Sequence, residues 1–304
     1  REREMFEGLF VALVTPFRKD GSLNEEKLRG LVNFHIEAGT DGLVPCATTS
    51  ENPAYTWEEH YRIIEIVTEE AGGRIKVVPG CGTNNTDRSV RNILKAKEYG
   101  ADGAMVVTPY YNKPTQEGLY AHFSKLADDG GLPLMLYNVP GRTGRNIEPE
   151  TVARLAENEM IVSIKEASGD VEQMSEIIYL CGDKINLLSG DDAITMAVMS
   201  IGGKGVVSVV GNIVPMDVLA MVDALKDGDL ARAREFHYKL LPLSQAMFIE
   251  TNPMPVKEAM NILGMEVGDV RLPLVRMKKE NREKLRKAME AYGLEIRNPG
   301  RVKA

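Results

Sequence analysis

The chain has 304 residues, of which 43% are hydrophobic and 27% are charged, which is the composition of a globular protein with a substantial packed core. Its formal net charge of −7 argues against nucleic acid or an anionic membrane surface as the main partner. Small molecules are therefore the expected ligands.

The expected compartment is the cytoplasm. No stretch reaches the roughly 18 consecutive apolar residues of a spanning helix, and the N-terminus has no positively charged segment followed by an apolar one. The three cysteines, Cys46, Cys81 and Cys181, form no C-x-x-C pair, which favours reduced thiols packed as small apolar groups. The four histidines are isolated from one another, so we do not expect a histidine-rich metal site.

Short apolar runs bounded by turn residues recur along the first two thirds of the chain and predict strands. Several of them lack polar alternation, which is typical of a parallel sheet covered on both faces. The eight runs are Phe10–Val14, Leu43–Cys46, Lys76–Val78, Met105–Thr108, Leu134–Tyr137, Ile161–Ile164, Ile185–Leu188 and Val206–Val210.

The intervening segments predict helices. Asn24–Ala38 and Trp57–Ala71 both carry apolar residues at helical spacing. From Phe10 to Val206 the chain advances 196 residues in seven steps, or 28 per step. This period is close to that of one βα unit, about 30 residues, in an eight-unit barrel. We therefore predict a closed (β/α)8 barrel (TIM barrel), with a doubly wound open sheet as the alternative.

Glycines mark three of the expected helix-to-strand junctions. Ala38-Gly39, Tyr99-Gly100 and Ile201-Gly202 each end a helical pattern shortly before an apolar run. A glycine just past a helix end can adopt the left-handed conformation that turns the chain toward the next strand. The three junctions therefore support repeated βα units.

The pattern changes after Val210. Met216–Leu225, Leu230–Phe248, Met254–Leu263 and Lys278–Tyr292 read as helices with no strands between them. We expect the first to close the barrel and the others to form a helical appendage. The predicted regions are a catalytic barrel over residues 5–226 and a C-terminal helical region over residues 227–304, with fraying expected from Asn298.

Polar side chains follow several of the predicted strands, where a barrel of this kind carries its active site. Lys165 is the most informative, because it comes directly after Ile161–Ile164 and has a side chain long enough to reach the barrel mouth. A desolvated lysine has a lowered pKa and becomes a nucleophile toward carbonyl carbons. The alternative is a structural lysine paired with Glu166, although adjacent strand residues point to opposite faces. Lys113, in a polar loop, is a weaker candidate.

The other candidate residues at the predicted barrel mouth can each be interpreted in two ways. Tyr137 and Tyr111 could pass protons or form an aromatic wall. Thr48 and Thr49 could bind a substrate oxygen or cap a turn. Arg142 follows Pro140-Gly141 and could hold a carboxylate through both guanidinium nitrogens, or could simply be solvated. Asp191-Asp192 are expected to cap the next helix rather than to bind a metal.

Six short motifs occur along the chain in a fixed order. They are Thr15-Pro16-Phe17, Thr48-Thr49, Thr108-Pro109-Tyr110-Tyr111-Asn112, Tyr137-Asn138-Val139-Pro140-x-Arg142-Thr143, Lys165-Glu166-Ala167 and Ser189-Gly190-Asp191-Asp192. As an ordered set they resemble the pyruvate-dependent class I aldolase family, and the likeness spans roughly Met5 to Leu294.

The resemblance implies that Lys165 forms a Schiff base with pyruvate. The resulting enamine attacks the aldehyde of L-aspartate 4-semialdehyde, and cyclisation gives the product of a lysine-pathway step. The resemblance also implies that no metal or organic cofactor is needed. Members of the family are commonly homotetramers built as pairs of dimers, so the expected partner is a second copy of the chain.

The same resemblance implies roles for the other rim residues. Tyr137, Thr48 and Tyr111 form the proton relay, with Tyr111 reaching the site of a neighbouring subunit. The implied substrate-binding residues are Thr49 for the pyruvate carboxylate, Arg142 for the semialdehyde carboxylate, and the backbones of Gly190 and Val207 for the pocket wall.

The chain departs from the family at two places. Ala47 and Ser50 stand where the family usually has glycine, and a positive φ at Ser50 would cost on the order of 1 kcal/mol. Trp57 and Arg88 occupy positions where lysine-inhibited members usually carry His and Glu. We therefore expect weak or absent inhibition by lysine.

Two other functions remain open at this point. The altered Thr48-Thr49-Ser50 loop keeps a sibling aldolase acting on a 2-keto-3-deoxy sugar acid or N-acetylneuraminate as an alternative, although such lyases generally lack an arginine at Arg142. A barrel that has lost catalysis and serves for binding or assembly is the third hypothesis. The presence of Tyr137, Arg142 and Lys165 argues against it.

Overall fold

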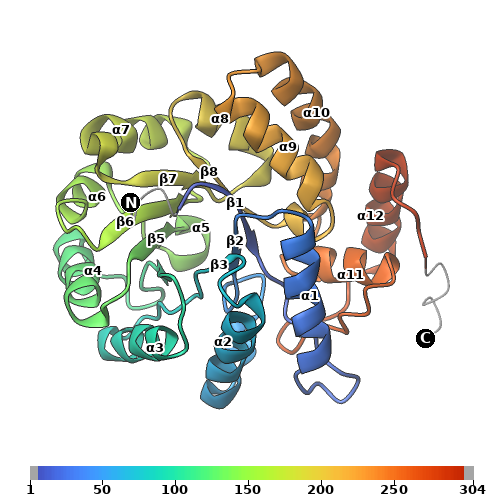
Figure 1. Cartoon of the computed structure of the whole chain (residues 1–304), viewed down its shortest axis with the longest axis horizontal. Helices are drawn as coiled ribbons and strands as arrows, with labels where there is room; N and C mark the ends of the chain where they lie inside the picture. Colours follow the sequence, from blue (N-terminus) through green and yellow to red (C-terminus); the bar gives the residue numbers. More distant parts are fainter. Residues whose placement is uncertain (1–5, 298–304) are drawn as a thin grey trace.

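The computed structural model describes residues 6–297 and shows eight parallel strands surrounded by helices (Figure 1). The strands are β1 (Gly8–Ala12), β2 (Gly42–Val44), β3 (Lys76–Val77), β4 (Ala104–Val107), β5 (Leu134–Asn138), β6 (Ile161–Glu166), β7 (Asn186–Ser189) and β8 (Gly205–Ser208). Each predicted run overlaps one of them, with ends that differ by at most two residues, so the eight predicted strands are confirmed.

The sheet closes into a ring. Its strand order is β3-β2-β1-β8-β7-β6-β5-β4, and the first and last strands in that order meet just beyond β3. There a parallel bridge joins Gly80 to Met105, whose backbone N–H donates to the Pro79 carbonyl over 2.9 Å. The fold is thus the predicted (β/α)8 barrel, and the alternative of an open, doubly wound sheet is wrong.

Helices cover the outside of the ring (Figure 1). They are α1 (Glu25–Glu37), α2 (Trp57–Ala71), α3 (Thr86–Glu98), α4 (Gln116–Gly130), α6 (Pro149–Leu155), α7 (Val171–Cys181), α8 (Thr195–Ser200) and α9 (Pro215–Lys226). Single turns are α5 (Pro140–Thr143), η1 (Asn52–Ala54), η2 (Gly182–Lys184), η3 (Asp192–Ile194) and η4 (Val210–Asn212). The helices expected at Asn24–Ala38 and Trp57–Ala71 begin where they do because Asn24 and Thr56 cap free N–H groups with their side chains.

Two apolar layers hold the barrel together. Along β1, Leu9 and Val11 face the layer between sheet and helices, whereas Phe10 and Ala12 face the interior of the ring. Both faces of the strand are apolar because both are covered. The interior layer consists of Phe6, Phe10, Ala12, Val44, Ala47, Val78, Met105, Met135, Tyr137, Val139, Val162, Leu188 and Val207. The barrel is therefore filled by side chains and is not a pore.

The glycines at the predicted junctions have the expected backbone. Gly39, Gly100 and Gly202 have φ values of 78°, 85° and 113°, in the region that favours glycine. Each lies just past a helix and before a strand. The junction prediction is confirmed.

Three further helices follow the barrel, as predicted: α10 (Leu230–Ala246), α11 (Met254–Ile262) and α12 (Lys279–Tyr292). α10 packs against α9 and α12, and α11 packs against α12 (Figure 1). The division of the chain at residue 226 stays a prediction, and the tail expected to fray from Asn298 lies outside the described residues.

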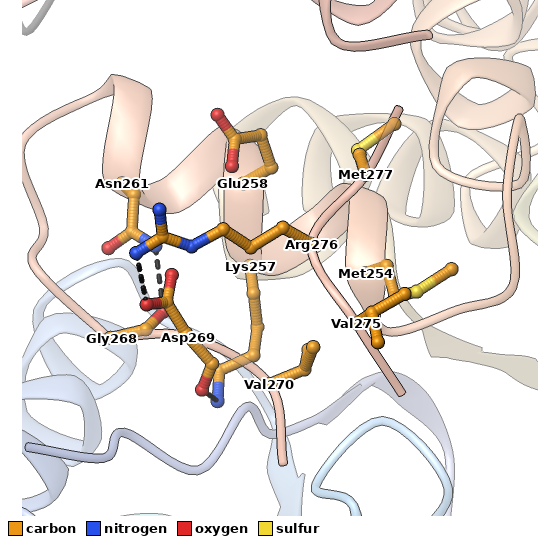
Figure 2. A pocket seen from close by; sticks show the side chains of 10 residues that line it. All are labelled: Met254, Lys257, Glu258, Asn261, Gly268, Asp269, Val270, Val275, Arg276 and Met277. Atoms are coloured by element: carbon orange, nitrogen blue, oxygen red, sulfur yellow. Dashed lines mark hydrogen bonds and ion pairs between the residues drawn. The ribbon is translucent and has the colours of Figure 1, made fainter. Parts of the chain in front are cut away.

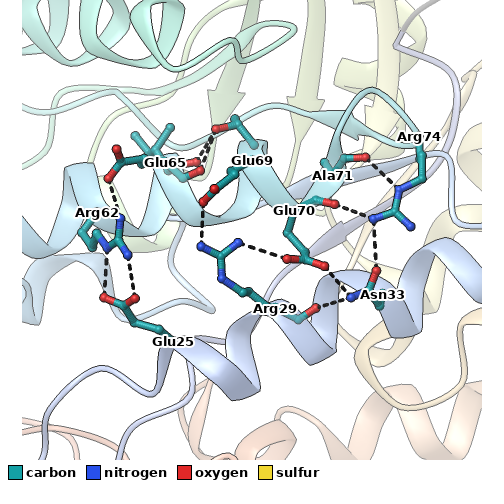
Figure 3. A network of polar contacts seen from close by, with 11 residues as sticks. Glu25, Arg29, Asn33, Arg62, Glu65, Glu69, Glu70, Ala71 and Arg74 are labelled. Atoms are coloured by element: carbon teal, nitrogen blue, oxygen red, sulfur yellow. Dashed lines mark hydrogen bonds and ion pairs between the residues drawn. The ribbon is translucent and has the colours of Figure 1, made fainter.

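A polar network joins α1 to α2 on the barrel surface (Figure 3). Arg62 pairs with Glu25 over 2.7 Å, and Arg29 contacts Glu69 and Glu70 over 2.6 and 3.0 Å. Pairs of this kind are solvent-screened and contribute roughly 0–1 kcal/mol each. The apolar contacts beneath them, which include Leu28 and Ile63, hold the two helices to the barrel.

Within residues 6–297, no helix combines the length and the apolar character that crossing a bilayer requires. Cys46, Cys81 and Cys181 are buried free thiols, and burial raises the pKa of each. They pack as apolar groups, as predicted.

Candidate active site

Lys165 lies near the end of β6, and its side chain is only 4% exposed. It is the register partner of Tyr137 on β5, so the two side chains leave the sheet on the same side. The Lys165 Nζ atom lies 4.2 Å from the centre of the Tyr137 ring. Over residues 6–297, this amine has neither an ion pair nor a hydrogen bond.

Glu166, the next residue, belongs to a different environment. Its carboxylate accepts hydrogen bonds from Asn138 Nδ2 over 2.9 Å, from the Ser168 backbone N–H over 2.7 Å and from Gln173 Nε2 over 3.3 Å. Burial raises the pKa of the Glu166 carboxyl above its ordinary value. Because the carboxylate is held on the opposite face of the strand, the alternative of a Lys165–Glu166 ion pair is wrong.

Gly190 lies against Lys165 from the end of β7. A Cβ atom at this position would lie 2.6 Å from Ala167 Cβ, which is closer than atoms tolerate, and 3.1 Å from Lys165 Cε, which is a tight contact. The glycine therefore keeps room beside the lysine stem. Val207 on β8 is fully buried and belongs to the interior layer together with Tyr137.

The turn after β2 carries the two threonines. Thr49 is 2% exposed and its Oγ1 accepts a hydrogen bond from Asn252 Nδ2 over 3.0 Å, whereas Thr48 is half-buried. The Ser50 hydroxyl donates to the Leu13 carbonyl over 2.6 Å and accepts from the Ala47 N–H over 3.1 Å. These contacts tie the turn to β1.

The expected strain at Ser50 is absent. The positive φ values in this turn belong to Cys46 and Glu51, at 57° and 66°, and not to Ser50. The serine therefore adopts an ordinary backbone conformation, and its side chain is used for hydrogen bonds.

Tyr111 is the candidate that the chain does not bring to Lys165. It is 90% exposed and has a φ of 73°. Its neighbour Asn112 donates through Nδ2 to the Asn84 carbonyl over 2.9 Å, which fixes the base of the loop. The phenol is thus exposed to solvent, and Lys113, the rival lysine on the same loop, is exposed as well.

Arg142 lies on the short helix α5 after β5 and is exposed. Its Nη2 donates to the Asn252 carbonyl over 3.3 Å, and its guanidinium has no carboxylate partner in the described part of the chain. Asn252 thereby contacts both Thr49 and Arg142. Sequence reasoning missed this residue, since its only signal was a polar Thr251-Asn252-Pro253 stretch before a predicted helix.

Asp191 and Asp192 have structural roles. Asp191 caps η3 by accepting from the Ala193 N–H over 2.9 Å, as expected. The expectation that Asp192 also acts as a cap is wrong: its buried carboxylate accepts from the backbone N–H groups of Val209 and Val210 and so fixes the end of β8. Burial raises the pKa of the Asp192 carboxyl.

Comparison with known proteins gives one consistent result. Residues 5–292 match the model of the dihydrodipicolinate synthetase family. The chain is 55% identical over 290 residues to the 4-hydroxy-tetrahydrodipicolinate synthase of Geotalea uraniireducens, with 95% of this chain and 100% of the relative covered. It is 52% identical to the protein of the same name from Thermodesulfovibrio yellowstonii, with 95% and 99% covered.

The fold is also close to that of a solved structure. The crystal structure of dihydrodipicolinate synthase from Aquifex aeolicus superposes with a TM-score of 0.94 at 46% sequence identity. The superposition covers 96% of this chain and 100% of that one. The similarity therefore extends over the barrel and the C-terminal helices together.

Proposed function

The chain belongs to the dihydrodipicolinate synthetase family, and we propose that Lys165 is the residue on which its reaction takes place. The enzyme is a class I aldolase-type lyase of lysine biosynthesis, which condenses pyruvate with L-aspartate 4-semialdehyde to 4-hydroxy-tetrahydrodipicolinate. The observation that carries the assignment of Lys165 is its position: a buried amine without an anionic partner, beside a phenol and a glycine.

The proposed chemistry begins with attack of the neutral Lys165 Nζ on the C2 carbonyl of pyruvate. The carbinolamine loses water to give an imine, and loss of a proton from the pyruvate methyl group gives an enamine. The enamine carbon forms a bond to the aldehyde carbon of the second substrate, whose oxygen takes up a proton. The amine of the semialdehyde then attacks the imine carbon, which closes the ring and releases Lys165.

These steps move protons, and Tyr137 is a phenol beside the reacting nitrogen. Its ring lies 4.2 Å from Lys165 Nζ, so its hydroxyl belongs to the same small volume. We assign it to the proton relay together with Thr48, which is half-buried on the adjoining turn.

Tyr111 is proposed as the third member of the relay, in the site of a neighbouring subunit. Its 90% exposure supports a contribution to a second copy of the chain. The proposed assembly is a homotetramer, built as a pair of dimers. In such an assembly each active site would be complete only with a residue from its neighbour.

The proposed binding residues divide by substrate. The buried Thr49 hydroxyl would bind the pyruvate carboxylate, and the backbones of Gly190 and Val207 would line that pocket. The Arg142 guanidinium at the rim, which has no carboxylate partner among residues 6–297, would hold the carboxylate of the semialdehyde through two parallel hydrogen bonds. The three buried free thiols agree with a reducing compartment, and we place the enzyme in the cytoplasm.

The test is reduction of the enzyme with borohydride in the presence of pyruvate, followed by peptide mass mapping. The expected result is a single stable adduct on Lys165, and its absence in the Lys165→Met variant. Lys113→Met is the matched control, which should keep the adduct. An unmodified chain, or an adduct on another lysine, would overturn the assignment.

A further inference from the structure

Glu51 is a buried carboxylate that the proposed mechanism does not use. It ends the turn that carries Thr48 and Thr49, and its side chain is 2% exposed. Its backbone has a φ of 66°, and Cys46 at the other end of the turn has a φ of 57°. A residue other than glycine keeps this left-handed conformation only where surrounding contacts fix it. The turn is therefore held from outside.

Both carboxylate oxygens of Glu51 are bound by the C-terminal region. Oε1 accepts from Lys257 Nζ over 2.8 Å, and Oε2 accepts from the Arg271 backbone N–H over 2.7 Å. Lys257 is itself 2% exposed, and its Nζ also donates to the Asp269 carbonyl over 3.0 Å (Figure 2). The Glu51 carboxylate is thus bound by two groups, an ammonium and a backbone N–H, that lie more than 200 residues away along the chain.

Lys257 and Arg271 are fixed in turn by Phe17, which follows β1. Lys257 Nζ lies 4.2 Å from the centre of the Phe17 ring, and the Arg271 guanidinium carbon lies 4.0 Å from it. The Arg271 guanidinium also donates to both carboxylate oxygens of Glu59 over 2.6 and 2.7 Å. The two residues that bind Glu51, Lys257 through its ammonium and Arg271 through its backbone N–H, are therefore themselves anchored to the barrel.

The same region contacts the turn a second time. Asn252 donates to Thr49 Oγ1 over 3.0 Å and lies five residues before Lys257, at the start of the α11 region. Residues 252–257 thus reach both Thr49 and Glu51. The pocket in Figure 2 lies beside this connection, between α11 and residues 268–277, and Lys165 is not among its lining residues.

We propose that Glu51 is a positioning residue: through Lys257 and Arg271 it holds the Thr48-Thr49 turn in place for pyruvate, which makes residues 252–271 part of the catalytic unit. The inference rests on the proposed function, because that function gives Thr48 and Thr49 their roles. A turn with left-handed residues at both ends relaxes when its anchor is lost, and the two threonine side chains move with it.

The first test separates positioning from stability. Glu51→Gln is close in shape and removes the charge, and the Glu51→Gln/Lys257→Met variant removes both charges so that neither is buried alone. We expect the KM for pyruvate to rise by about tenfold or more in each, because a displacement near 1 Å at a binding group costs up to about a hundredfold. The KM for the semialdehyde should change less. A purely structural role would lower the amount of active enzyme and leave both KM values unchanged.

The matched control is Arg276→Met, which breaks an exposed pair with Asp269 in the same region and should leave both KM values unaltered. Borohydride trapping of pyruvate on the unaltered enzyme tests the proposed function separately. If Lys165 is not modified in that experiment, the proposed function is refuted regardless of the KM values of the variants. If trapping succeeds and the folded variants bind pyruvate like the unaltered enzyme, the positioning role is wrong.

A second test needs no variant and covers the case in which these substitutions prevent folding. Hydrogen exchange of the unaltered enzyme is followed by mass spectrometry with and without pyruvate. The Arg271 amide, which donates to Glu51, should exchange more slowly when pyruvate is bound. Equal exchange in both states would contradict the coupling between the pyruvate site and the C-terminal region.

Discussion

Lys165 and Tyr137 are register partners on adjacent parallel strands, and the lysine amine lies 4.2 Å from the centre of the tyrosine ring. The register brings the two side chains out of the sheet on one side, at the end of the barrel where catalytic groups collect. The pair places an amine that can form an imine beside a phenol that can give and take protons.

Replacing Tyr137 by phenylalanine keeps the ring against Lys165 and removes only the hydroxyl. If that hydroxyl transfers protons, kcat should fall by about 100-fold or more, the usual size of a general acid–base contribution. Borohydride trapping of pyruvate at high concentration should still modify Lys165. Steady-state kinetics with both substrates checks the prediction. An unchanged kcat would mean that Tyr137 only packs against Lys165 and transfers no proton.

Gly190→Ala should block the site by volume. The new methyl group would lie 2.6 Å from Ala167 Cβ and 3.1 Å from Lys165 Cε, so Ala167 must shift and the lysine stem must give by a few tenths of an ångström. We expect trapping of pyruvate on Lys165 to slow by about tenfold, because the shift of the lysine is smaller than the 1 Å that costs about a hundredfold. Gly30→Ala is the control, because nothing lies within 4 Å of a Cβ there, and it should react like the unaltered enzyme.

The position of Lys165 could be predicted because a strand end is a local signal: an apolar run, then a lysine. The barrel followed from the repetition of such signals. The anchors of the Thr48-Thr49 turn could not be predicted, since Asn252 and Lys257 come from more than 200 residues away and only the closed fold brings them there. The backbone conformation of that turn could not be predicted either, because its left-handed residues are Cys46 and Glu51 and not Ser50.

Lysine should inhibit the enzyme weakly or not at all. The Arg88 guanidinium carbon lies 4.7 Å from the centre of the Trp57 ring, so an aromatic ring and a cation occupy the positions at which the family resemblance implies His and Glu in lysine-inhibited members. A lysine molecule whose ammonium approached this position would meet the like charge of Arg88. Initial rates at increasing lysine concentration check this, with a lysine-inhibited relative as the positive control. Half-inhibition at micromolar lysine would contradict the prediction.

Three buried histidines should make the fold sensitive to mild acid. Burial lowers the pKa of His35 from 6.5 to about 3, and those of His60 and His122 to about 4. The folded state therefore keeps these rings neutral below pH 6.5, whereas the unfolded chain takes up a proton on each. Their contribution to stability is complete above pH 6.5 and is lost as the pH falls toward 4.

Each such proton lowers the free energy of unfolding by about 1.4 kcal/mol per pH unit. Burial raises the pKa values of Asp192 and Glu166, which act in the opposite direction, so a single slope does not isolate the histidines. The informative quantity is the difference between the unaltered enzyme and His35→Asn. The measurement is urea unfolding at pH 7, 6 and 5. Between pH 6 and 5 the free energy of unfolding should fall by about 1.4 kcal/mol less in the variant than in the unaltered enzyme, which corresponds to about one proton. Equal slopes would mean that His35 is protonated in the folded state, and its burial without a charged partner would then need another explanation.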